Sequence, residues 1–259
     1  MRAKIFMGSS TEFLPAVDAM RDDLEEEFEL MVWNQRVFLP GASTLETLVA
    51  NARGADAAIF VFGVDDMALM RNVLLNVPRD NVVFEYGLFM GAGDRRRCFF
   101  VIPAAQRDFH TPSDLAGVTA GTFDSAKLST DPREAVKAAT DAIRAAIRVL
   151  QDQHGLSGSW THCWTGPDGT QNRCDLELIQ LGDYVRGIFP WNGSQFELRG
   201  SIERQRYLSA MYRDTKAHGY SGTLHLVIGP KGELRGKWAG WSAGAPGANA
   251  GDCVWTRRG

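Results

Sequence analysis

The stretch Ala57-Ala58-Ile59-Phe60-Val61-Phe62 is apolar throughout and is followed by Gly63. A short apolar run without alternation is typical of a strand that is buried on both faces. Such strands occur in parallel sheets whose two faces are covered by helices. The run therefore predicts an α/β fold for the part of the chain around it.

Strands and helices alternate on either side of this run. Apolar and β-branched residues predict four further strands, and apolar residues at helical spacing predict four helices. The strands are expected at Ala3–Met7, Leu30–Trp33, Cys98–Ile102 and Val118–Phe123, and the helices at 14–28, 44–53, 81–92 and 132–150. This order predicts a domain over residues 1–150 with a five-stranded parallel sheet covered on both faces.

The sequence changes character after residue 150. Residues 151–156 are the expected linker, and residues 157–259 the second domain, in which helical spacing is absent and turn sequences recur. About eight strands are expected, near 158–165, 173–181, 184–191, 194–202, 206–213, 220–229, 233–241 and 252–257. Their even spacing favours an all-β domain that closes as an up-and-down antiparallel barrel, with an open sandwich as the alternative.

The composition excludes several classes of protein. Acidic residues are in excess in the first half and basic residues slightly in excess in the second, and neither half has the dense basic stripe that binds DNA or RNA polymers. The sequence also shows no export signal and no apolar stretch of roughly 18–20 residues that would span a membrane. Four cysteines without a CxxC pair or metal-ligand spacing favour reduced thiols. A cytoplasmic protein without a metal site is expected.

Small and polar residues follow the predicted strands of the first domain. Gly8, Ser9 and Ser10 follow the first strand, Trp33 ends the second, and Asp65 follows the third. Ligands of open parallel sheets bind beyond these carboxyl ends, where backbone amides at a helix N-terminus can approach a phosphate. The five residues are therefore candidates for substrate binding. An alternative function for the serines is to cap the next helix.

The motif RDNVVFE at residues 79–85 begins the helix expected at 81–92, with its Asp or Asn as the cap. Glu85 lies at the margin of the apolar face of this helix. A capping box would place the glutamate three residues after the cap, at position 83 or 84, so Glu85 does not belong to one. An ion pair with Arg79 or with the run Arg95–Arg97 remains an alternative to a catalytic role.

Five segments of the first domain resemble the bacterial TIR-like nucleotide-binding family of antiphage effectors, including those of CBASS-type systems. They are Ile5–Ser10, Val32-Trp33, Ala55–Phe62, Arg79–Phe89 and Pro112–Gly117. The likeness covers roughly residues 2–150, and RDNVVFE with the later PSDL is its specific part. It implies a flavodoxin-like TIR fold that cleaves NAD+ at the nicotinamide–ribose bond, with NAD+ as the substrate and no cofactor.

The resemblance also assigns roles to residues. Glu85 takes the place of the family's catalytic glutamate, and the segment Asn34–Ser43 that of a mobile loop after the second strand. Tyr86 is a departure, because a smaller aliphatic residue is common there. Self-association into an oligomer or filament is implied, because neighbouring protomers complete the active site in this group. The motif positions expected to line the NAD site are Phe6, Ser9, Arg79, Asp80 and Asp114.

The second domain resembles the small lipocalin-like β-barrel sensors of cyclic-oligonucleotide defence systems, through its architecture and turn spacing. This likeness implies a cyclic di- or trinucleotide activator that drives oligomerisation. Aromatic faces stack on bases, and arginines bind phosphates. The candidate contacts for this ligand are Trp160, Arg186, Trp191, Arg204 and Arg206. The alternative is that the tryptophans fill the barrel and the arginines are solvated.

We therefore expect an NAD+ glycohydrolase effector of antiphage defence whose barrel binds the activating nucleotide. Two alternatives remain open at this level. One is a non-catalytic nucleotide-binding or scaffold protein with a TIR-like fold. The other is an enzyme related to nucleoside deoxyribosyltransferases, which combine a similar parallel sheet with a glutamate.

Overall fold

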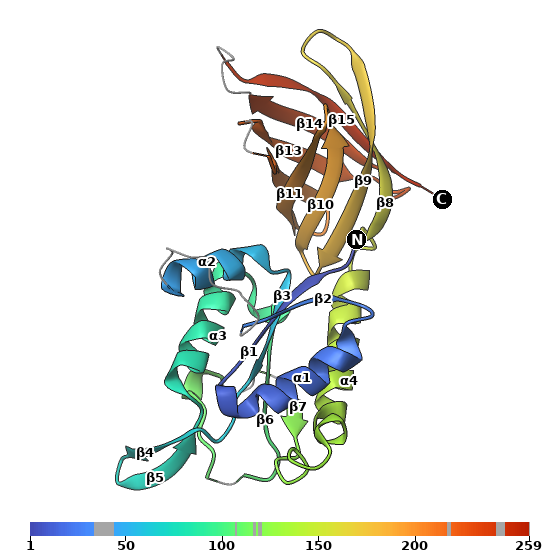
Figure 1. The fold of residues 1–259 in the computed structure, drawn as a ribbon. Helices are drawn as coiled ribbons and strands as arrows, with labels where there is room; N and C mark the ends of the chain where they lie inside the picture. The colour runs from blue at the N-terminus through green and yellow to red at the C-terminus, as the bar shows by residue number, and fades with distance from the viewer. Residues whose placement is uncertain are drawn as a thin grey trace. The chain divides into compact units, whose positions relative to one another are not determined.

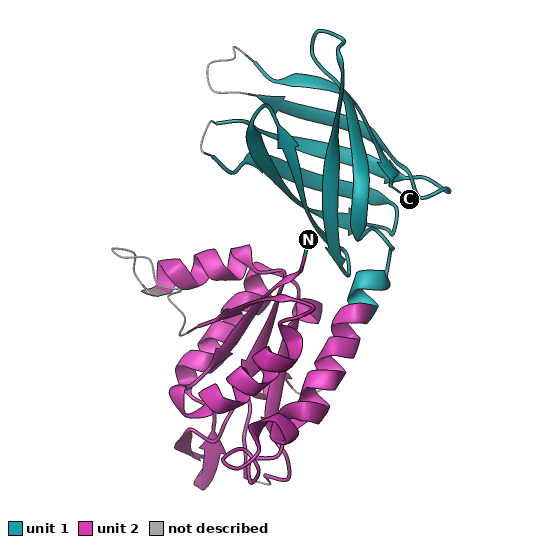
Figure 2. Cartoon of the chain, turned by 45° about the vertical axis from the view of Figure 1, so that its right-hand side comes forward, with its two compact units in different colours: residues 1, 149–259 teal, residues 2–148 magenta. Residues whose placement is uncertain are grey.

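The computed structural model describes residues 1–33, 44–106, 108–115, 118, 121–216, 219–241 and 247–258. The chain divides into two compact units, one of residues 2–148 and one of residues 149–259 together with Met1 (Figure 2). The boundary falls inside helix α4 (Pro132–Asp152), which continues two residues into the segment expected as a linker. None of the described helices is long and apolar enough to cross a membrane.

The first unit is a five-stranded parallel sheet, as predicted. Its strand order is β2-β1-β3-β6-β7, and α1 and α4 lie on one side while α2 and α3 lie on the other (Figure 1). Every residue of β3 is buried, which agrees with a strand covered on both faces. The strands are β1 (Lys4–Ser9), β2 (Glu29–Val32), β3 (Ala57–Val61), β6 (Cys98–Pro103) and β7 (Gly121–Phe123). The helices besides α4 are α1 (Leu14–Leu24), α2 (Thr44–Gly54) and α3 (Asp80–Ala92), with short 3-10 turns η1 (Thr11–Phe13), η2 (Arg95–Arg97) and η3 (Ser113–Leu115).

Two of the predicted elements are shorter than expected. α1 ends at Leu24 rather than at Phe28, immediately before three consecutive glutamates, whose negative charges are unfavourable at the C-terminal end of a helix. β7 begins at Gly121 rather than at Val118, and residues 119–120 lie outside the described part of the chain. Neither difference changes the order of the strands in the sheet.

The structure contains a hairpin that the sequence pattern does not predict. β4 (Asp66–Met70) and β5 (Val73–Val77), which lie between β3 and α3 in the sequence, pair antiparallel (Figure 1). At the tip, Arg71 and Asn72 have φ values of 50° and 63°, as a two-residue hairpin turn requires. Such turns usually contain glycine, so the pair Arg-Asn is a weak sequence signal.

An aromatic cluster fixes α3 on the sheet. The Tyr86 ring lies edge-on to Phe60 at 5.6 Å, Phe62 at 5.5 Å and Phe100 at 5.3 Å between ring centroids. These contacts join one face of α3 to β3 and β6. Phe89, one turn further along, adds an edge contact with Phe60 at 5.4 Å. The helix therefore has a defined rotation about its axis, which also defines the direction of Glu85.

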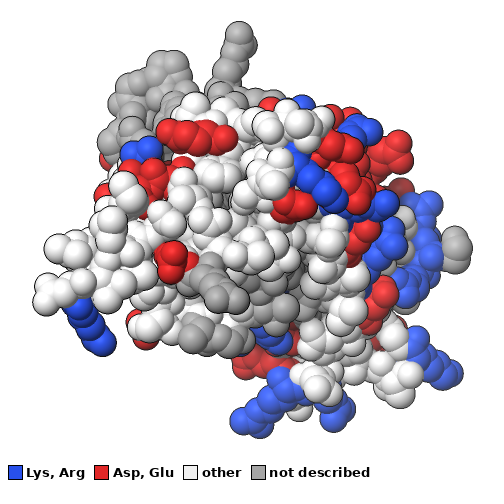
Figure 3. All heavy atoms as spheres, turned by 90° about the horizontal axis from the view of Figure 1, so that it is seen from below, with Lys and Arg blue, Asp and Glu red and all other residues white. Residues whose placement is uncertain are grey.

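Figure 3 shows one face of the molecule as spheres. Acidic and basic side chains are interspersed around the rim of this face, most densely on the right, and most of the centre that is not grey is uncharged. No continuous basic surface forms among the described residues drawn on this face, which agrees with the charge pattern of the sequence.

The second unit is a closed barrel of eight strands, each antiparallel to its neighbours, which confirms the predicted barrel and rules out the open sandwich. Close backbone approaches require Gly200 and Gly236, since a Cβ would lie 2.2 Å from the Ser209 carbonyl oxygen or 1.9 Å from that of His225. The four cysteines of the chain are free. The strands are β8 (Gly158–Thr165), β9 (Gln171–Leu181), β10 (Tyr184–Trp191), β11 (Ser194–Glu203), β12 (Tyr207–Asp214), β13 (Ser221–Ile228), β14 (Leu234–Trp241) and β15 (Asn249–Arg257).

Candidate functional site

The strand order of the first unit reverses between β1 and β3, so a crevice is expected at the carboxyl ends of these strands. Ser9 ends β1, and its hydroxyl donates to the Ser10 carbonyl oxygen at 2.8 Å. Trp33, just after β2, donates its indole N–H to the Ser9 hydroxyl at 3.4 Å. The structure therefore connects three predicted substrate-binding residues at this edge of the sheet.

Asp65 links this edge to the start of α3. Its Oδ2 accepts a hydrogen bond from the backbone N–H of Arg79 at 3.0 Å. Arg79 is the N-cap residue of α3 and makes no side-chain capping hydrogen bond among the described residues, so the prediction that Asp80 or Asn81 caps this helix is wrong. Asp80 instead accepts from the Asn81 N–H at 2.7 Å. The hydrogen bond between Asp65 and Arg79 thus ties the α3 N-terminus to the loop after β3.

Two polar atoms at this edge are buried without a hydrogen-bond partner among the described residues. They are the hydroxyl of Ser10 and Oδ1 of Asp65. A buried polar group without a partner costs roughly 1–3 kcal/mol, and a bound ligand or water can remove that cost. This edge of the sheet therefore offers an acceptor, Asp65 Oδ1, suited to a ribose hydroxyl, and a hydroxyl, that of Ser10, which can donate to a phosphate.

The remaining predicted substrate-binding residues differ in their positions. The ring of Phe6 is buried in the core and stacks on Phe89 at 4.4 Å, so it does not line the crevice. Gly8 allows close packing, because a Cβ there would lie 2.5 Å from the Phe60 ring. Asp80 and Asp114 are exposed. The structure therefore leaves Phe6 in a structural position rather than against a ligand.

Glu85 is half-buried on the flank of α3, next to the buried face of the helix. Among the described residues it has no hydrogen-bond or ion-pair partner. Burial alone raises the pKa of its carboxyl from 4.5 to about 7. A partly desolvated carboxylate without a cation beside it favours a ligand that carries or develops positive charge.

The ion pair that the sequence left open for Glu85 does not form among the described residues. The Arg79 guanidinium lies 3.4 Å from Glu12 and 3.5 Å from Asp66. In the Arg95–Arg97 run, Arg96 pairs with Asp94 at 2.7 Å, and Arg97 donates to a backbone carbonyl. The segment 34–43, expected to be the loop beside the NAD site, lies outside the described residues, as does Gly117 of the later motif.

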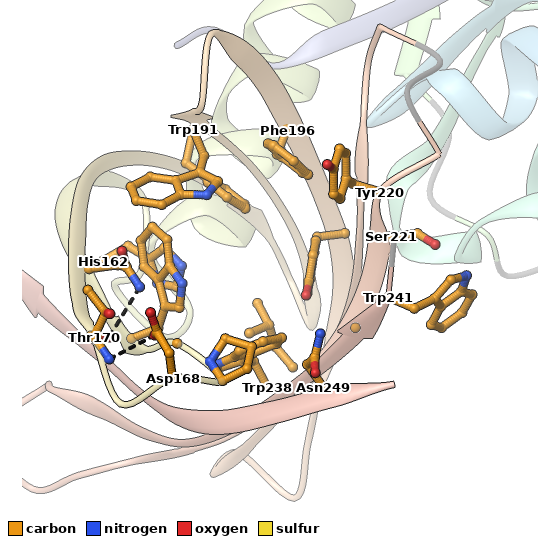
Figure 4. Close-up of a pocket in the computed structure, with 18 residues that line it drawn as sticks. His162, Asp168, Thr170, Trp191, Phe196, Tyr220, Ser221, Trp238, Trp241 and Asn249 are labelled. Carbon is orange, nitrogen blue, oxygen red and sulfur yellow. Dashed lines mark hydrogen bonds between the residues drawn. The ribbon is translucent and has the colours of Figure 1, made fainter. Parts of the chain in front are cut away.

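The second unit contains a cavity of about 540 Å³ at one end of the barrel. Aromatic side chains are the largest class in its wall, and Asp168 is the one charged residue among the described residues that line it. In Figure 4, Trp191, Phe196 and Trp238 stand around the open space, while Trp241 points away from it. A volume of this size and an apolar wall with few polar groups are typical of small-molecule sites.

Of the five predicted sensor contacts, Trp191 lines this cavity. Trp160 and Arg186 are almost fully buried elsewhere, and the Trp160 indole donates to the Leu156 carbonyl oxygen at 2.9 Å. Arg204 and Arg206 belong to the turn between β11 and β12, at the opposite end of these strands from the cavity residues. The structure therefore does not bring the predicted set together.

Comparison with known proteins identifies the first unit. Residues 4–125 match the family model described as the TIR domain of CAP12/Pycsar effector proteins. This unit is a CAP12/Pycsar TIR domain. CD-NTase-associated protein 12 of Lachnospiraceae bacterium (strain RUG226) is 33% identical over 153 residues, 59% of this chain and 46% of that protein. Pycsar effector protein PaPycTIR of Pseudomonas aeruginosa is 34% identical over 147 residues, 56% of this chain and 47% of that protein.

The chain thus spans about half the length of the curated relatives it matches. The CAP12/Pycsar TIR domain includes Glu85 and every predicted substrate-binding residue, whereas the barrel strands begin at Gly158, beyond the matched segment. A solved redesigned β-barrel aligns with 42% of this chain and 96% of its own chain, at 11% identity and a TM-score of 0.30.

Sequence reasoning missed most of the residues that line the cavity of the second unit. Along β8, alternate residues face the barrel interior, which places His162 and Trp164 in the cavity wall. On β14 the corresponding residue is Trp238. The alternation of inward-facing and outward-facing side chains along each strand was the signal that could have selected these residues over the arginines.

Proposed function

We propose that this protein is an NAD+ glycohydrolase effector of antiphage defence that acts in the cytoplasm. The observation that supports this proposal most strongly is Glu85, a half-buried carboxylate without a cationic partner among the described residues of a CAP12/Pycsar TIR domain. The polar groups of Ser10 and Asp65 at the carboxyl edge of the sheet support a nucleotide substrate. NAD+ is the proposed substrate, and no cofactor or metal is required.

The proposed reaction breaks the bond between nicotinamide and ribose C1′, and the oxygen of a water molecule bonds to C1′ in its place while a proton is released to the solvent. As this bond lengthens, positive charge spreads over C1′ and O4′ of the ribose. The Glu85 carboxylate stabilises this charge more strongly than it stabilises the ground state, which lowers the barrier. Nicotinamide leaves as a neutral molecule from a pyridinium, so no general acid is needed. One carboxylate is therefore enough, unlike the pair used by most glycosidases.

The barrel is proposed to bind a cyclic di- or trinucleotide and thereby to drive self-association. Its aromatic cavity supports this proposal, because bases stack favourably on aromatic rings. Assembly would then bring protomers together and complete the NAD site. The CAP12/Pycsar relationship of the TIR domain supports a signalling role of this kind.

Product analysis tests the proposed reaction against its alternatives. The purified full chain is incubated with NAD+ and with free nucleosides, each with and without a panel of cyclic nucleotides. Release of nicotinamide supports the glycohydrolase, whereas exchange of bases between nucleosides supports a deoxyribosyltransferase. Absence of both reactions across the whole panel supports a non-catalytic scaffold and contradicts the proposal.

The rate of NAD+ cleavage should depend on the protonation of Glu85. The reaction uses the carboxylate, and burial raises the pKa of this group to about 7. We expect kcat/KM to fall about tenfold for each pH unit below 7 and to level off above it. The profile of kcat should be shifted to lower pH, because bound NAD+ places a cation near the carboxylate. A flat profile between pH 5 and 8 would contradict this role of Glu85.

The β4–β5 hairpin is a candidate surface for self-association. Leu69 and Leu74 pair directly across the two strands and are 71% and 60% exposed, and Met67 on the same face is 69% exposed. Exposed apolar clusters of this kind commonly mark protein interfaces. A second copy of the chain is the proposed partner, because the hairpin leads directly into α3, the helix that carries Glu85.

Charges placed on this hairpin should therefore weaken assembly. We expect the double variant Leu69→Lys and Leu74→Lys to lower the oligomeric fraction at least about tenfold, because burying an unpaired ammonium in an apolar contact is costly. Light scattering with the activating panel measures the effect. Met211→Lys, at an equally exposed apolar residue of the barrel, is the control. Unchanged assembly of the double variant would exclude the hairpin as the contact.

A further inference from the structure

We infer that the barrel cavity receives a base of the activating nucleotide, read by His162, while the phosphates stay outside near Arg173 and Lys216. This inference rests on the proposed function of the barrel and assigns it a binding site. Its three supports are the fixed aromatic wall, a hydrogen-bond donor in that wall, and the distribution of charge around the cavity.

The aromatic wall is held in place by its own contacts. Trp164 and Trp191 meet edge to face at 4.5 Å between ring centroids, and Phe189 stacks on Phe196 at 5.2 Å. The indole N–H of Trp238 donates to the Thr165 carbonyl oxygen at 2.9 Å, which fixes that ring on the far side of the cavity. A planar ligand therefore meets flat surfaces that need little reorganisation.

His162 gives this wall one defined donor. Its Nδ1 accepts a hydrogen bond from the Trp255 indole N–H at 2.7 Å, and an indole nitrogen can only donate. The neutral imidazole must therefore carry its proton on Nε2. The ring stacks on Trp164 at 4.6 Å within the cavity wall, and no described residue accepts from Nε2. A ring nitrogen or carbonyl oxygen of a base can accept this hydrogen bond.

The charges around the cavity argue against phosphates inside it. No lysine or arginine occurs among the described lining residues, and Asp168 contributes a carboxylate. A phosphate in the cavity would thus lose its hydration without gaining a cation. A neutral heterocycle is compatible with the same surroundings.

A second cavity beside the first is lined by two basic and two acidic side chains. The β9–β10 ladder stops at the pair Glu177–Ile188, although both strands continue beyond it. Pro190 has no N–H to extend the ladder. The adjoining cavity shares Phe189 and Trp191 with the aromatic one. Of its two carboxylates, Asp175 pairs with Arg258 at 2.7 Å and Glu177 accepts from the Ser159 hydroxyl at 2.6 Å. Its two basic residues, Arg173 and Lys216, are the groups that can meet a phosphate. A nucleotide can therefore place its base on one side of Trp191 and its phosphate on the other.

Direct binding measurements on the full chain test this arrangement. The probes are the four free nucleosides, ribose 5-phosphate, and cyclic mono-, di- and trinucleotides carrying each base, titrated by calorimetry. We expect at least one nucleoside and its cyclic nucleotide to bind, and ribose 5-phosphate not to bind. The inference is overturned if no nucleoside and no cyclic nucleotide binds. It is also overturned if ribose 5-phosphate binds more tightly than every nucleoside.

Variants separate the base contact from the phosphate contact. Trp191→Ala and Trp238→Ala should weaken the binding of both the nucleoside and the cyclic nucleotide roughly tenfold or more. Trp191→Phe should restore most of this binding. Arg173→Ala and Lys216→Ala should weaken the binding of the cyclic nucleotide severalfold and leave the affinity for the nucleoside unchanged. Tyr207→Ala, an exposed aromatic residue at the other end of the barrel, is the control for both ligands. Equal effects of the control and the cavity variants contradict the site.

His162→Asn tests the donor, because the Asn carbonyl can still accept from Trp255 while the Nε2–H is lost. We expect this variant to reduce the preference among the four bases, with thermal unfolding recorded to verify the fold. An unchanged base preference removes His162 from the inference. Ligand binding at the cavity without NAD+ cleavage would leave the inference intact and defeat the proposed function, whereas ligand-activated cleavage that the cavity variants do not alter would do the reverse.

Discussion

Glu85→Gln should reduce NAD+ cleavage by roughly 10³-fold or more while the protein stays folded. The amide has nearly the shape of the carboxyl group but no negative charge, so it cannot stabilise the cation that develops on the ribose. Nicotinamide release from the purified variant, measured at saturating activator, gives the rate. Glu134→Gln, on an exposed part of α4, is the matched control and should keep full activity. Undiminished cleavage by Glu85→Gln would exclude this residue as the catalytic carboxylate.

The same variant should be more stable than the parent protein at pH 8, which provides a second readout. The pKa of Glu85 rises from 4.5 in the unfolded chain to about 7 in the folded protein, so the folded state binds the proton more tightly. Stability therefore falls as pH rises from about 4.5 to about 7, and it stays at the lower level above this range. We expect Glu85→Gln to recover about 1–2 kcal/mol at pH 8, allowing for solvent screening, and to make no difference below pH 4.

Gly236→Ala should destabilise the barrel by about 3 kcal/mol or more. A Cβ at this position would lie 1.9 Å from the carbonyl oxygen of His225 on the neighbouring strand, so β13 and β14 would have to separate. Calorimetry should show an earlier transition for the barrel and an unchanged one for the TIR domain. Gly247→Ala, where nothing lies within 4 Å of the added atom, is the control. Equal melting of the two variants would contradict the tight closure of the barrel.

The position of Glu85 illustrates what the sequence could not provide. The motif RDNVVFE identified the residue and excluded a capping box, yet it left an ion pair as an equal alternative. Arg79 pairs instead with Glu12 and Asp66, from η1 and from a hairpin that no local signal predicted. Partners distant in sequence decided this question, because charge pairing depends on where separate elements meet.

In the barrel, the sequence predicted the strands but not which of their side chains line the cavity. Turn spacing and aromatic strands were enough to predict eight strands, but the choice of tryptophans and arginines by type selected residues at both ends of the barrel. Trp160 lies in the core and Trp191 in the cavity, although both are tryptophans at inward-facing positions of barrel strands. Residue type indicates what a side chain can bind, whereas its height along the barrel decides whether a ligand can reach it.

The sequence by itself determined the α/β class of the first unit, the eight strands of the second, and Glu85 as the residue of interest. These follow from apolar periodicity, turn residues and a local motif, all of which act within a few residues of the chain. Only the tertiary structure decided that Glu85 lacks an ion-pair partner among the described residues, that the barrel closes, and that its cavity is aromatic and contains His162. Those properties depend on strand register and long-range packing. A shift of one residue in the register of a strand would move every one of its side chains to the opposite face.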